Sequence, residues 1–308
     1  MSVQRVAAID CGTNSIRLLV ADLDPDTGEL HDLDRRMTIV RLGQGVDRTG
    51  RLAPEALERT FAACRDYAGI IASHGAGRLR FVATSASRDA ENRDEFVDGV
   101  RAILGVEPEV ISGDEEAELS FTGATRELSS AEGPYLVFDL GGGSTEFVLG
   151  SDRVEAARSV DIGCVRMTER HGADTDAMRA DIDKALDLAA ATVPLTGAAT
   201  LVGLAGTVTT VAAIALELPA YDSVAIHHSR IPLERVREVT GMLLSSTPEQ
   251  RAAIPSMHPG RVDVIGAGAL VLLAVMERSG ASELVVSEHD ILDGIAWSVA
   301  REALEETS

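Results

Sequence analysis

The 308-residue chain is poor in lysine, cysteine and aromatic residues, and each shortage excludes a kind of site or limits how the core can be built. Its one lysine, Lys184, lies in a charged stretch and not after a glycine-rich loop, which excludes a P-loop of the G-x-x-x-x-G-K-[ST] type. The three cysteines (Cys11, Cys64 and Cys164) are far apart and form no C-x-x-C pair, so they exclude a disulfide framework and predict reduced thiols. Because aromatics make up only 3% of the chain, its cores must be built mainly from Ala, Val, Leu and Ile.

Several short catalytic motifs are also missing from the sequence. It contains no G-x-G-x-x-G in a strand–helix context, no G-x-S-x-G and no H-E-x-x-H, which excludes a dinucleotide site, a nucleophile elbow and a zincin-type metal site. No metal-ligand spacing joins the seven histidines, which include His227, His228 and His289, so we expect surface or packing roles for them.

The chain is strongly acidic and has no convincing membrane segment. It has 28 Lys and Arg against 49 Asp and Glu, a formal net charge of −21, which disfavours binding to nucleic acid or to an anionic membrane. Residues 1–10 lack the pattern of a signal peptide. The uncharged stretch 188–216 is interrupted by Pro194 and glycines and predicts a buried strand, a glycine turn and a helix start, while 264–276 is too short to span a bilayer. We therefore expect a soluble cytoplasmic protein.

The most informative feature is a repeat separated by 129 residues. Both copies read as an apolar strand, then D-x-G-x-x-S, then a second apolar strand. The D-x-G-x-x-S motifs begin at Asp10 and Asp139. One D-x-G alone is typical of an ordinary hairpin turn. Two copies in the same register, one with three consecutive glycines, instead predict a pair of ligand-binding loops.

Each loop has the composition of a phosphate site. Glycine lets backbone N–H groups converge into a concavity for an anion, and neighbouring hydroxyls add hydrogen-bond donors. A carboxylate beside such a site is a good place for Mg²⁺ or its waters. The predicted phosphate-binding residues of the two loops are Gly12, Thr13, Asn14 and Ser15, and Gly141, Gly142, Gly143, Ser144 and Thr145.

These loops, with other motifs along the chain, resemble the exopolyphosphatase and guanosine pentaphosphate phosphohydrolase (Ppx/GppA phosphatase) family. The further motifs are VRLGQG at 40–45, ATSASRDAEN at 83–92, ISGDEEA at 111–117, GCVR at 163–166 and GLAGT at 203–207. The resemblance implies a two-lobed α/β fold of the actin, hexokinase and heat-shock-chaperone type (ribonuclease H-like), with a catalytic cleft between the lobes. It also implies the short form of the family, without the C-terminal helical region of larger relatives.

The family pattern places the catalytic base at the second glutamate of the ISGDEEA motif, which is Glu116. Ser112 followed by Glu115 fits a capping box at a helix start, and this structural role accounts for Glu115. Hydrolysis of a phosphoanhydride needs a water molecule in line with the leaving phosphate, which a carboxylate can position and deprotonate.

By the same resemblance, Asp139 and Glu146 bind Mg²⁺ or its waters and Asp10 contributes from the other lobe, with Mn²⁺ as an alternative metal. Arg88 is the best candidate for a bidentate phosphate contact, while Arg17 is equally compatible with a surface ion pair. The third loop, with Gly206 and Thr207, either cradles substrate phosphates or packs a strand–helix junction.

The leading hypothesis for function is an exopolyphosphatase that releases orthophosphate from inorganic polyphosphate. The alternatives are a guanosine pentaphosphate 5′-phosphohydrolase, for which guanosine penta- or tetraphosphate is substrate or inhibitor, and an ATP-binding kinase or chaperone-like ATPase of the same superfamily. Leu292 stands where many relatives carry an arginine, which weakens the guanosine alternative. Family members often form homodimers, and no interface is evident in the sequence.

The expected domains are residues 1–125 with 290–308, and residues 126–289. Apolar strand patterns at 6–20 and 135–150, followed by helical stretches at 54–74 and 174–190, predict two α/β lobes. The polar segment 123–133 is expected to act as a hinge between them.

Overall fold

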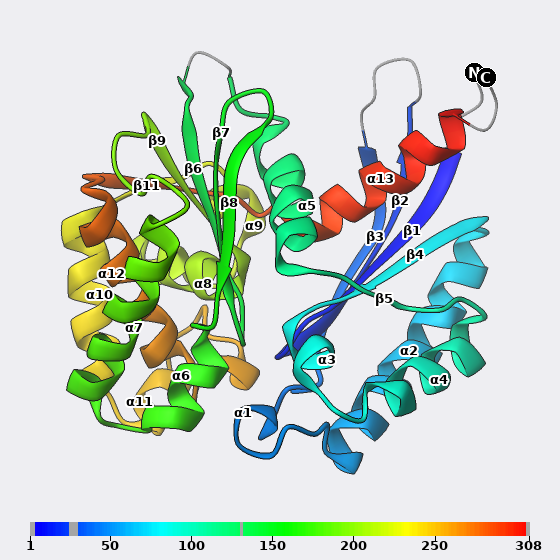
Figure 1. Cartoon of the computed structure of the whole chain (residues 1–308), viewed down its shortest axis with the longest axis horizontal. Coiled ribbons are helices and arrows are strands. Elements are labelled where there is room, and N and C mark those ends of the chain that lie inside the picture. The colour runs from blue at the N-terminus through cyan, green and yellow to red at the C-terminus, as the bar shows by residue number, and fades with distance from the viewer. Residues whose placement is uncertain (1–3, 25–29, 130–131, 306–308) are drawn as a thin grey trace. The chain divides into compact units, whose positions relative to one another are not determined.

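The computed structural model describes residues 4–24, 30–129 and 132–305. The chain divides into two compact units, one formed by residues 1–123 with 291–308 and the other by residues 124–290 (Figure 1). None of the helices in the described part of the chain combines the length and the apolar composition needed to cross a lipid bilayer.

Unit 1 is built on a five-stranded sheet with the order β3-β2-β1-β4-β5. Strands β1 and β3 both run antiparallel to β2, which lies between them. On the other side of β1, β4 runs parallel to β1 and β5 runs parallel to β4. The strands are β1 (Gln4–Cys11), β2 (Ser15–Leu23), β3 (Leu30–Ile39), β4 (Arg78–Ala83) and β5 (Glu109–Val110). The helices are α1 (Val46–Thr49), α2 (Pro54–His74), α3 (Ser85–Asp89), α4 (Arg93–Leu104), α5 (Gly113–Thr125), which reaches the boundary with unit 2, and α13 (Ile291–Glu305).

The alternation of side chains along β1 divides the core of unit 1 into two layers. Ala7, Ile9 and Cys11 pack with residues of α2 and α4, while Val6 and Ala8 pack with residues of α5 and α13 on the other face. Figure 1 shows α2 and α4 on one side of this sheet and α13 on the other. Both faces of the strand are apolar because both are covered by helices. Asp10 continues the second set, so its side chain lies on the face covered by α5 and α13.

Unit 2 repeats this topology in a six-stranded sheet with the order β10-β11-β9-β6-β7-β8. Strands β6, β7 and β8 are antiparallel, β9 and β11 add in parallel, and β10 is an antiparallel edge strand. The strands are β6 (Tyr135–Leu140), β7 (Thr145–Gly150), β8 (Val154–Val160), β9 (Thr200–Leu204), β10 (Arg230–Pro232) and β11 (Glu283–Val286). The helices are α6 (Cys164–His171), α7 (Thr175–Ala190), α8 (Ala205–Ala215), α9 (Ser223–Ile226), α10 (Leu233–Ser245), α11 (Pro248–Ala252), the 3₁₀ helix η2 (Pro259–Arg261) and α12 (Ile265–Ser279).

The fold class expected from the sequence is confirmed. Two α/β units with the same strand order in their first five strands are what the 129-residue repeat and the resemblance predicted. The apolar stretch 264–276 forms most of the buried helix α12. The 188–216 stretch contains β9 and the whole of α8, so the expected strand and helix start are both present.

Candidate functional site

The first predicted phosphate loop is the turn of the β1–β2 hairpin in unit 1. The Gly12 amide donates to the Ser15 carbonyl at 3.0 Å, which closes the turn, and the Thr13 and Ser85 hydroxyls lie 2.8 Å apart in a buried contact. The Gly43 amide donates to the Thr13 carbonyl at 2.9 Å. A Cβ on Gly43 would lie 2.3 Å from Thr13 Cγ2, so the VRLGQG motif needs glycine there to pack against the loop.

Asp10 and Arg17 form an ion pair across the same hairpin. They are directly opposite in the antiparallel register, and the Asp10 Oδ2 atom accepts from Arg17 Nη2 at 2.6 Å and from Nε at 3.0 Å. The Asp10 carboxylate is buried, so a fork of charge-assisted hydrogen bonds offsets its loss of hydration. Arg17 is therefore the internal counter-charge of Asp10.

Glu116 is a buried carboxylate in the first turn of α5, with only 8% of its surface exposed. Its Oε2 atom accepts from Arg88 Nη1 at 3.1 Å, and the same nitrogen donates to the Ile111 carbonyl at 2.9 Å. The structure thus joins two motifs that are separate in the sequence, because Arg88 lies in the last turn of the short helix α3. It places Arg88, the predicted phosphate ligand, directly on the predicted base.

The neighbouring Glu115 has a different environment. Its backbone amide donates to the Ser112 hydroxyl at 3.2 Å, which is the N-terminal half of the expected capping box. Its carboxylate instead accepts from Arg80 Nη2 at 2.9 Å. These consecutive glutamates of one helical turn therefore bind different partners. Of the two, only Glu116 is buried, and it is the one that pairs with Arg88.

The second predicted loop is the turn of the β6–β7 hairpin in unit 2. Here the Gly141 amide donates to the Ser144 carbonyl at 3.0 Å, the same bond that closes the first loop. The amides of Val165 and Arg166, at the start of α6, donate to the Gly142 carbonyl at 2.9 and 3.0 Å. A Cβ on Gly163 would lie 2.4 Å from the Gly142 carbonyl, so this glycine allows the α6 end to meet the loop.

Two carboxylates lie side by side beneath this second loop. Asp139 and Glu146 are opposite each other in the antiparallel register, so both side chains project from the same face of the sheet. Asp139 is buried and Glu146 is only 1% exposed, and the Ser159 hydroxyl donates to Glu146 Oε1 at 2.7 Å. The equivalent position of unit 1 is Arg17, so the repeat has an ion pair in one unit and a pair of acids in the other.

The donor set of Asp139 and Glu146 fits a hard divalent cation. Carboxylate oxygens are the ligands that Mg²⁺, Mn²⁺ and Ca²⁺ prefer. Two acids on adjacent strands at a buried position favour a positive charge beside them, since like charges so close repel one another.

The third predicted loop is a direct junction of β9 and α8, and Gly206 and Thr207 lie in the first turn of α8. Ala205 has φ of 70°, a left-handed conformation that costs a residue with a side chain about 1–2 kcal/mol and is most common at functional sites. A Cβ on Gly206 would lie 1.5 Å from Arg261 Nη1, so the guanidinium of Arg261 packs directly on this glycine. Gly268 is likewise in close contact with the Thr207 side chain.

Arg261 is a candidate site residue that the sequence did not reveal. It ends η2, 55 positions after Gly206, in a segment that carries no recognisable motif. Its position adds a cation to the glycine loop and requires residue 206 to have no side chain. The only sequence signal was the local Pro259-Gly260, which predicts a turn and gives no indication of its contacts.

Two titratable groups near the β9–α8 junction, the Cys164 thiol and the Tyr221 phenol, are kept in their neutral forms. Burial raises the pKa of the Cys164 thiol, at the start of α6, despite a hydrogen bond with Thr207 and the charge of Arg261. Burial and the Glu288 carboxylate also raise the pKa of the Tyr221 phenol, whose oxygen lies 2.8 Å from Thr209 Oγ1 on α8. Neither group is poised to act as a nucleophile at neutral pH.

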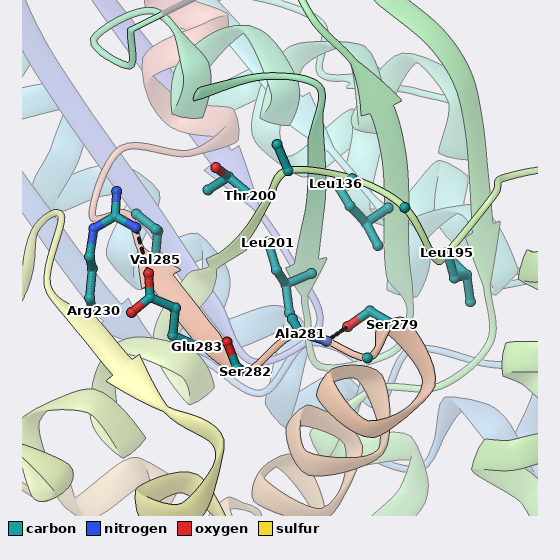
Figure 2. A pocket seen from close by; sticks show the side chains of 14 residues that line it. Leu136, Leu195, Thr200, Leu201, Arg230, Ser279, Ala281, Ser282, Glu283 and Val285 are labelled. Atoms are coloured by element: carbon teal, nitrogen blue, oxygen red, sulfur yellow. Dashed lines mark hydrogen bonds and ion pairs between the residues drawn. The ribbon is translucent and has the colours of Figure 1, made fainter. Parts of the chain in front are cut away.

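Unit 2 also contains a cavity of about 340 Å³, whose lining residues are drawn in Figure 2. Its walls come from the amino ends of β6, β9 and β11 and the end of α12, and they include the ion pair of Arg230 with Glu283. The glycine loops follow the carboxyl ends of β6 and β9, which is where α/β sheets usually bind ligands. We therefore do not assign this cavity to the catalytic site.

Fold and hairpins together define an α/β protein of two similar units, with duplicated glycine hairpins and buried acids. The chain belongs to the Ppx/GppA phosphatase family, whose profile matches residues 19–302. It is 54% identical over 318 aligned residues to exopolyphosphatase 2 of Mycobacterium tuberculosis, covering 97% of this chain and all of that protein.

Solved structures agree with this placement. The crystal structure of an exopolyphosphatase-like protein is 45% identical, with a TM-score of 0.92, and the match covers 97% of this chain and 99% of that one. An exopolyphosphatase from Cytophaga hutchinsonii is 25% identical, with a TM-score of 0.87 over 97% of this chain and 98% of that chain.

Proposed function

We propose that the protein is an exopolyphosphatase, a phosphoanhydride hydrolase that removes the terminal phosphate of inorganic polyphosphate and releases orthophosphate. The observation that carries the proposal is the ion pair of the buried Glu116 with Arg88, in a unit that also holds a glycine hairpin of the repeat. Identity of 54% over the full length of exopolyphosphatase 2 of M. tuberculosis supports the same reaction.

In this proposal Glu116 is the general base. Water attacks the terminal phosphorus while its proton passes to the Glu116 carboxylate, and the bond from that phosphorus to the bridging oxygen breaks. The shortened chain leaves on the bridging oxygen. Arg88 holds the carboxylate through Nη1 and keeps it oriented by its second bond to the Ile111 carbonyl. Burial of the carboxylate excludes bulk water from the base.

The loops would bind the phosphates of the chain. Backbone amides and hydroxyls of residues 12–15 and 141–145 supply donors without adding negative charge. The same role is proposed for Gly206 and Thr207, with Arg261 as a further cation beside them. Arg88 has its Nη1 donors directed at Glu116 and Ile111, so any phosphate contact would come from its other nitrogens.

The resemblance to the family implies a divalent metal ion, and the acid pair of unit 2 fits one. We propose Mg²⁺, with Mn²⁺ as an alternative, held by Asp139 and Glu146 of unit 2. When bound there, the ion would neutralise charge on phosphate oxygens. Ser159 would keep the Glu146 carboxylate in position through its 2.7 Å bond. The role of Asp10 as a further metal ligand stays a prediction, because Arg17 already provides the counter-charge of its carboxylate.

The observation that favours polyphosphate over guanosine pentaphosphate is the position of Leu292. At the place where many relatives carry arginine, this chain has a leucine that is buried among the apolar residues of α13 and β1. A side chain in that core cannot hydrogen-bond a nucleotide. We further propose that the two compact units are the two domains of the enzyme.

The test measures orthophosphate release with Mg²⁺ from short-chain polyphosphate, long-chain polyphosphate, guanosine pentaphosphate and ATP. We expect release from polyphosphate and its loss in Glu116→Gln. Activity confined to guanosine pentaphosphate would assign the alternative function. Turnover of ATP alone would place the protein with the nucleotide-dependent members of the superfamily.

A further inference from the structure

Three residues that are distant in the sequence meet in unit 2 to form a cluster of metal-binding side chains. They are Glu127, His227 and His289, and their ligand atoms all lie within 4.8 Å of one another. Glu127 follows α5, His227 follows α9, and His289 lies between β11 and α13. No ligand spacing along the chain pointed to these histidines, because the three segments are brought together only by the fold.

The distances suit a transition metal. Glu127 Oε2 lies 3.1 Å from His227 Nε2 and 3.5 Å from His289 Nδ1. Ligand atoms about 2.0–2.1 Å from a tetrahedral zinc ion are themselves roughly 3.3–3.4 Å apart. Two of the three separations are close to this value and the third is within 4.8 Å, so shifts of about an ångström would let the ligands enclose an ion.

The donor types separate this cluster from the acids of the glycine loop. Two imidazoles and one carboxylate favour Zn²⁺, Ni²⁺ or Co²⁺, whereas the all-oxygen pair of Asp139 and Glu146 favours Mg²⁺. The cluster is also accessible, since the exposed fractions of the Glu127, His227 and His289 side chains are 54%, 21% and 32%. A solvent-facing set of three ligands leaves the fourth position to water.

Hydrogen bonds hold the cluster together. His227 Nδ1 accepts from the Glu288 amide at 3.1 Å, so a neutral His227 carries its proton on Nε2 and donates it to Glu127. Metal binding at Nε2 would move that proton to Nδ1, and the Glu288 amide would have to turn away. Part of the binding free energy would thus be spent on local rearrangement.

We propose that Glu127, His227 and His289 form a binding site for one divalent transition metal ion of the zinc class. The site is independent of the proposed reaction and of the Mg²⁺ ligands. Glu127 lies four residues after the first passage of the chain between its two compact units, and His289 lies two residues before Ile291, where the chain returns. An ion bound here would cross-link the two connecting segments on their unit 2 side.

The test is titration of metal-free protein with Zn²⁺ by isothermal calorimetry, with Mg²⁺ present in excess to fill the oxygen site. We expect one Zn²⁺ per chain, and an affinity that falls at least tenfold in Glu127→Gln and in His289→Gln. His31→Gln is the matched control, because His31 is exposed on β3 of unit 1, and it should bind like the wild type. The buried cysteines should not compete, since burial raises the pKa of Cys64 to about 12.

A second readout uses Co²⁺, whose visible absorption reports its coordination and is independent of catalytic activity. Wild type and His31→Gln should show the strong bands of a four-coordinate ion, and both cluster variants should lose them. Unfolding temperatures in the absence of metal establish that the variants are folded. No stoichiometric Zn²⁺ binding by the wild type, or equal affinity in wild type and cluster variants, would overturn the proposal.

Discussion

At the residue scale, the chemistry depends on which of two adjacent glutamates is held by Arg88. Glu116→Gln keeps the size of the side chain and a hydrogen-bond acceptor for Arg88, but it removes the basic oxygen. We expect kcat for orthophosphate release from polyphosphate to fall about 10²- to 10⁴-fold, the usual contribution of a general base, without loss of thermal stability.

Glu115→Gln is the matched control for this prediction. Its backbone bond to Ser112 remains, and only the partly buried contact with Arg80 is weakened. Arg80 keeps its bond to Glu109, so activity should stay within a few-fold of wild type. The assignment of the base would be wrong if the two substitutions reduced kcat equally.

The acid pair of unit 2 leads to a second prediction at this scale. Glu146→Gln removes one of two neighbouring negative charges while an oxygen remains for the Ser159 hydroxyl. A hard divalent cation would then be held mainly by Asp139, so we expect the Mg²⁺ concentration for half-maximal activity to rise at least tenfold. Activity measured across a Mg²⁺ series tests this. Glu155→Gln, at an exposed position on β8, should leave the Mg²⁺ dependence unchanged.

At the element scale, the packing of α13 against α5 within unit 1 depends on one glycine. A Cβ on Gly294 would lie 2.1 Å from the Leu119 carbonyl oxygen, which is backbone and cannot rotate away. We expect Gly294→Ala to lower the free energy of unfolding by about 1–3 kcal/mol, because the helices must separate. Denaturant unfolding of purified protein measures this change.

Gly69→Ala, in the same unit, is expected to raise the free energy of unfolding instead of lowering it. Gly69 lies in α2, and a Cβ added to it would meet no atom within 4 Å, so alanine should stabilise the helix by about 0.5–1 kcal/mol. No loss of stability in Gly294→Ala would contradict the close approach of α13 and α5, and a loss in Gly69→Ala would contradict the open surroundings of Gly69.

The elements of the repeat were predictable because their signal is local. The D-x-G-x-x-S pattern lies within one hairpin, and both copies indeed share the bond from the first loop glycine to the serine carbonyl, as at Gly12 and Gly141. The contact of Arg261 with Gly206 was not predictable, because it joins segments 55 residues apart through tertiary packing. For the same reason the Arg88–Glu116 contact could not be deduced from the two motifs alone.

At the scale of the whole molecule, acid should destabilise the fold. Although burial opposes it, hydrogen bonds from Arg179 and Arg237 hold the pKa of Glu277 below its usual value. A hydrogen bond from Arg5 likewise lowers the pKa of Asp22. Carboxylates with lowered folded pKa values contribute stability that is fully present above their unfolded pKa values, about 4, and lost as the pH falls further. Unfolding temperature should therefore drop between about pH 5 and pH 3, and Glu277→Gln should make that drop smaller.

The net charge of −21 predicts how the whole molecule meets a polyanionic substrate. Repulsion between the acidic surface and polyphosphate acts over the Debye length, which is about 30 Å at 0.01 M salt and about 8 Å at 0.15 M. At fixed saturating Mg²⁺ we expect kcat/KM to rise as monovalent salt increases across this range, because encounter becomes faster, while kcat stays constant. Steady-state kinetics with long-chain polyphosphate at constant temperature measures both. If kcat/KM fell with salt, the loops and Arg261 would attract the substrate more strongly than the acidic exterior repels it, and cations local to the loops would govern encounter.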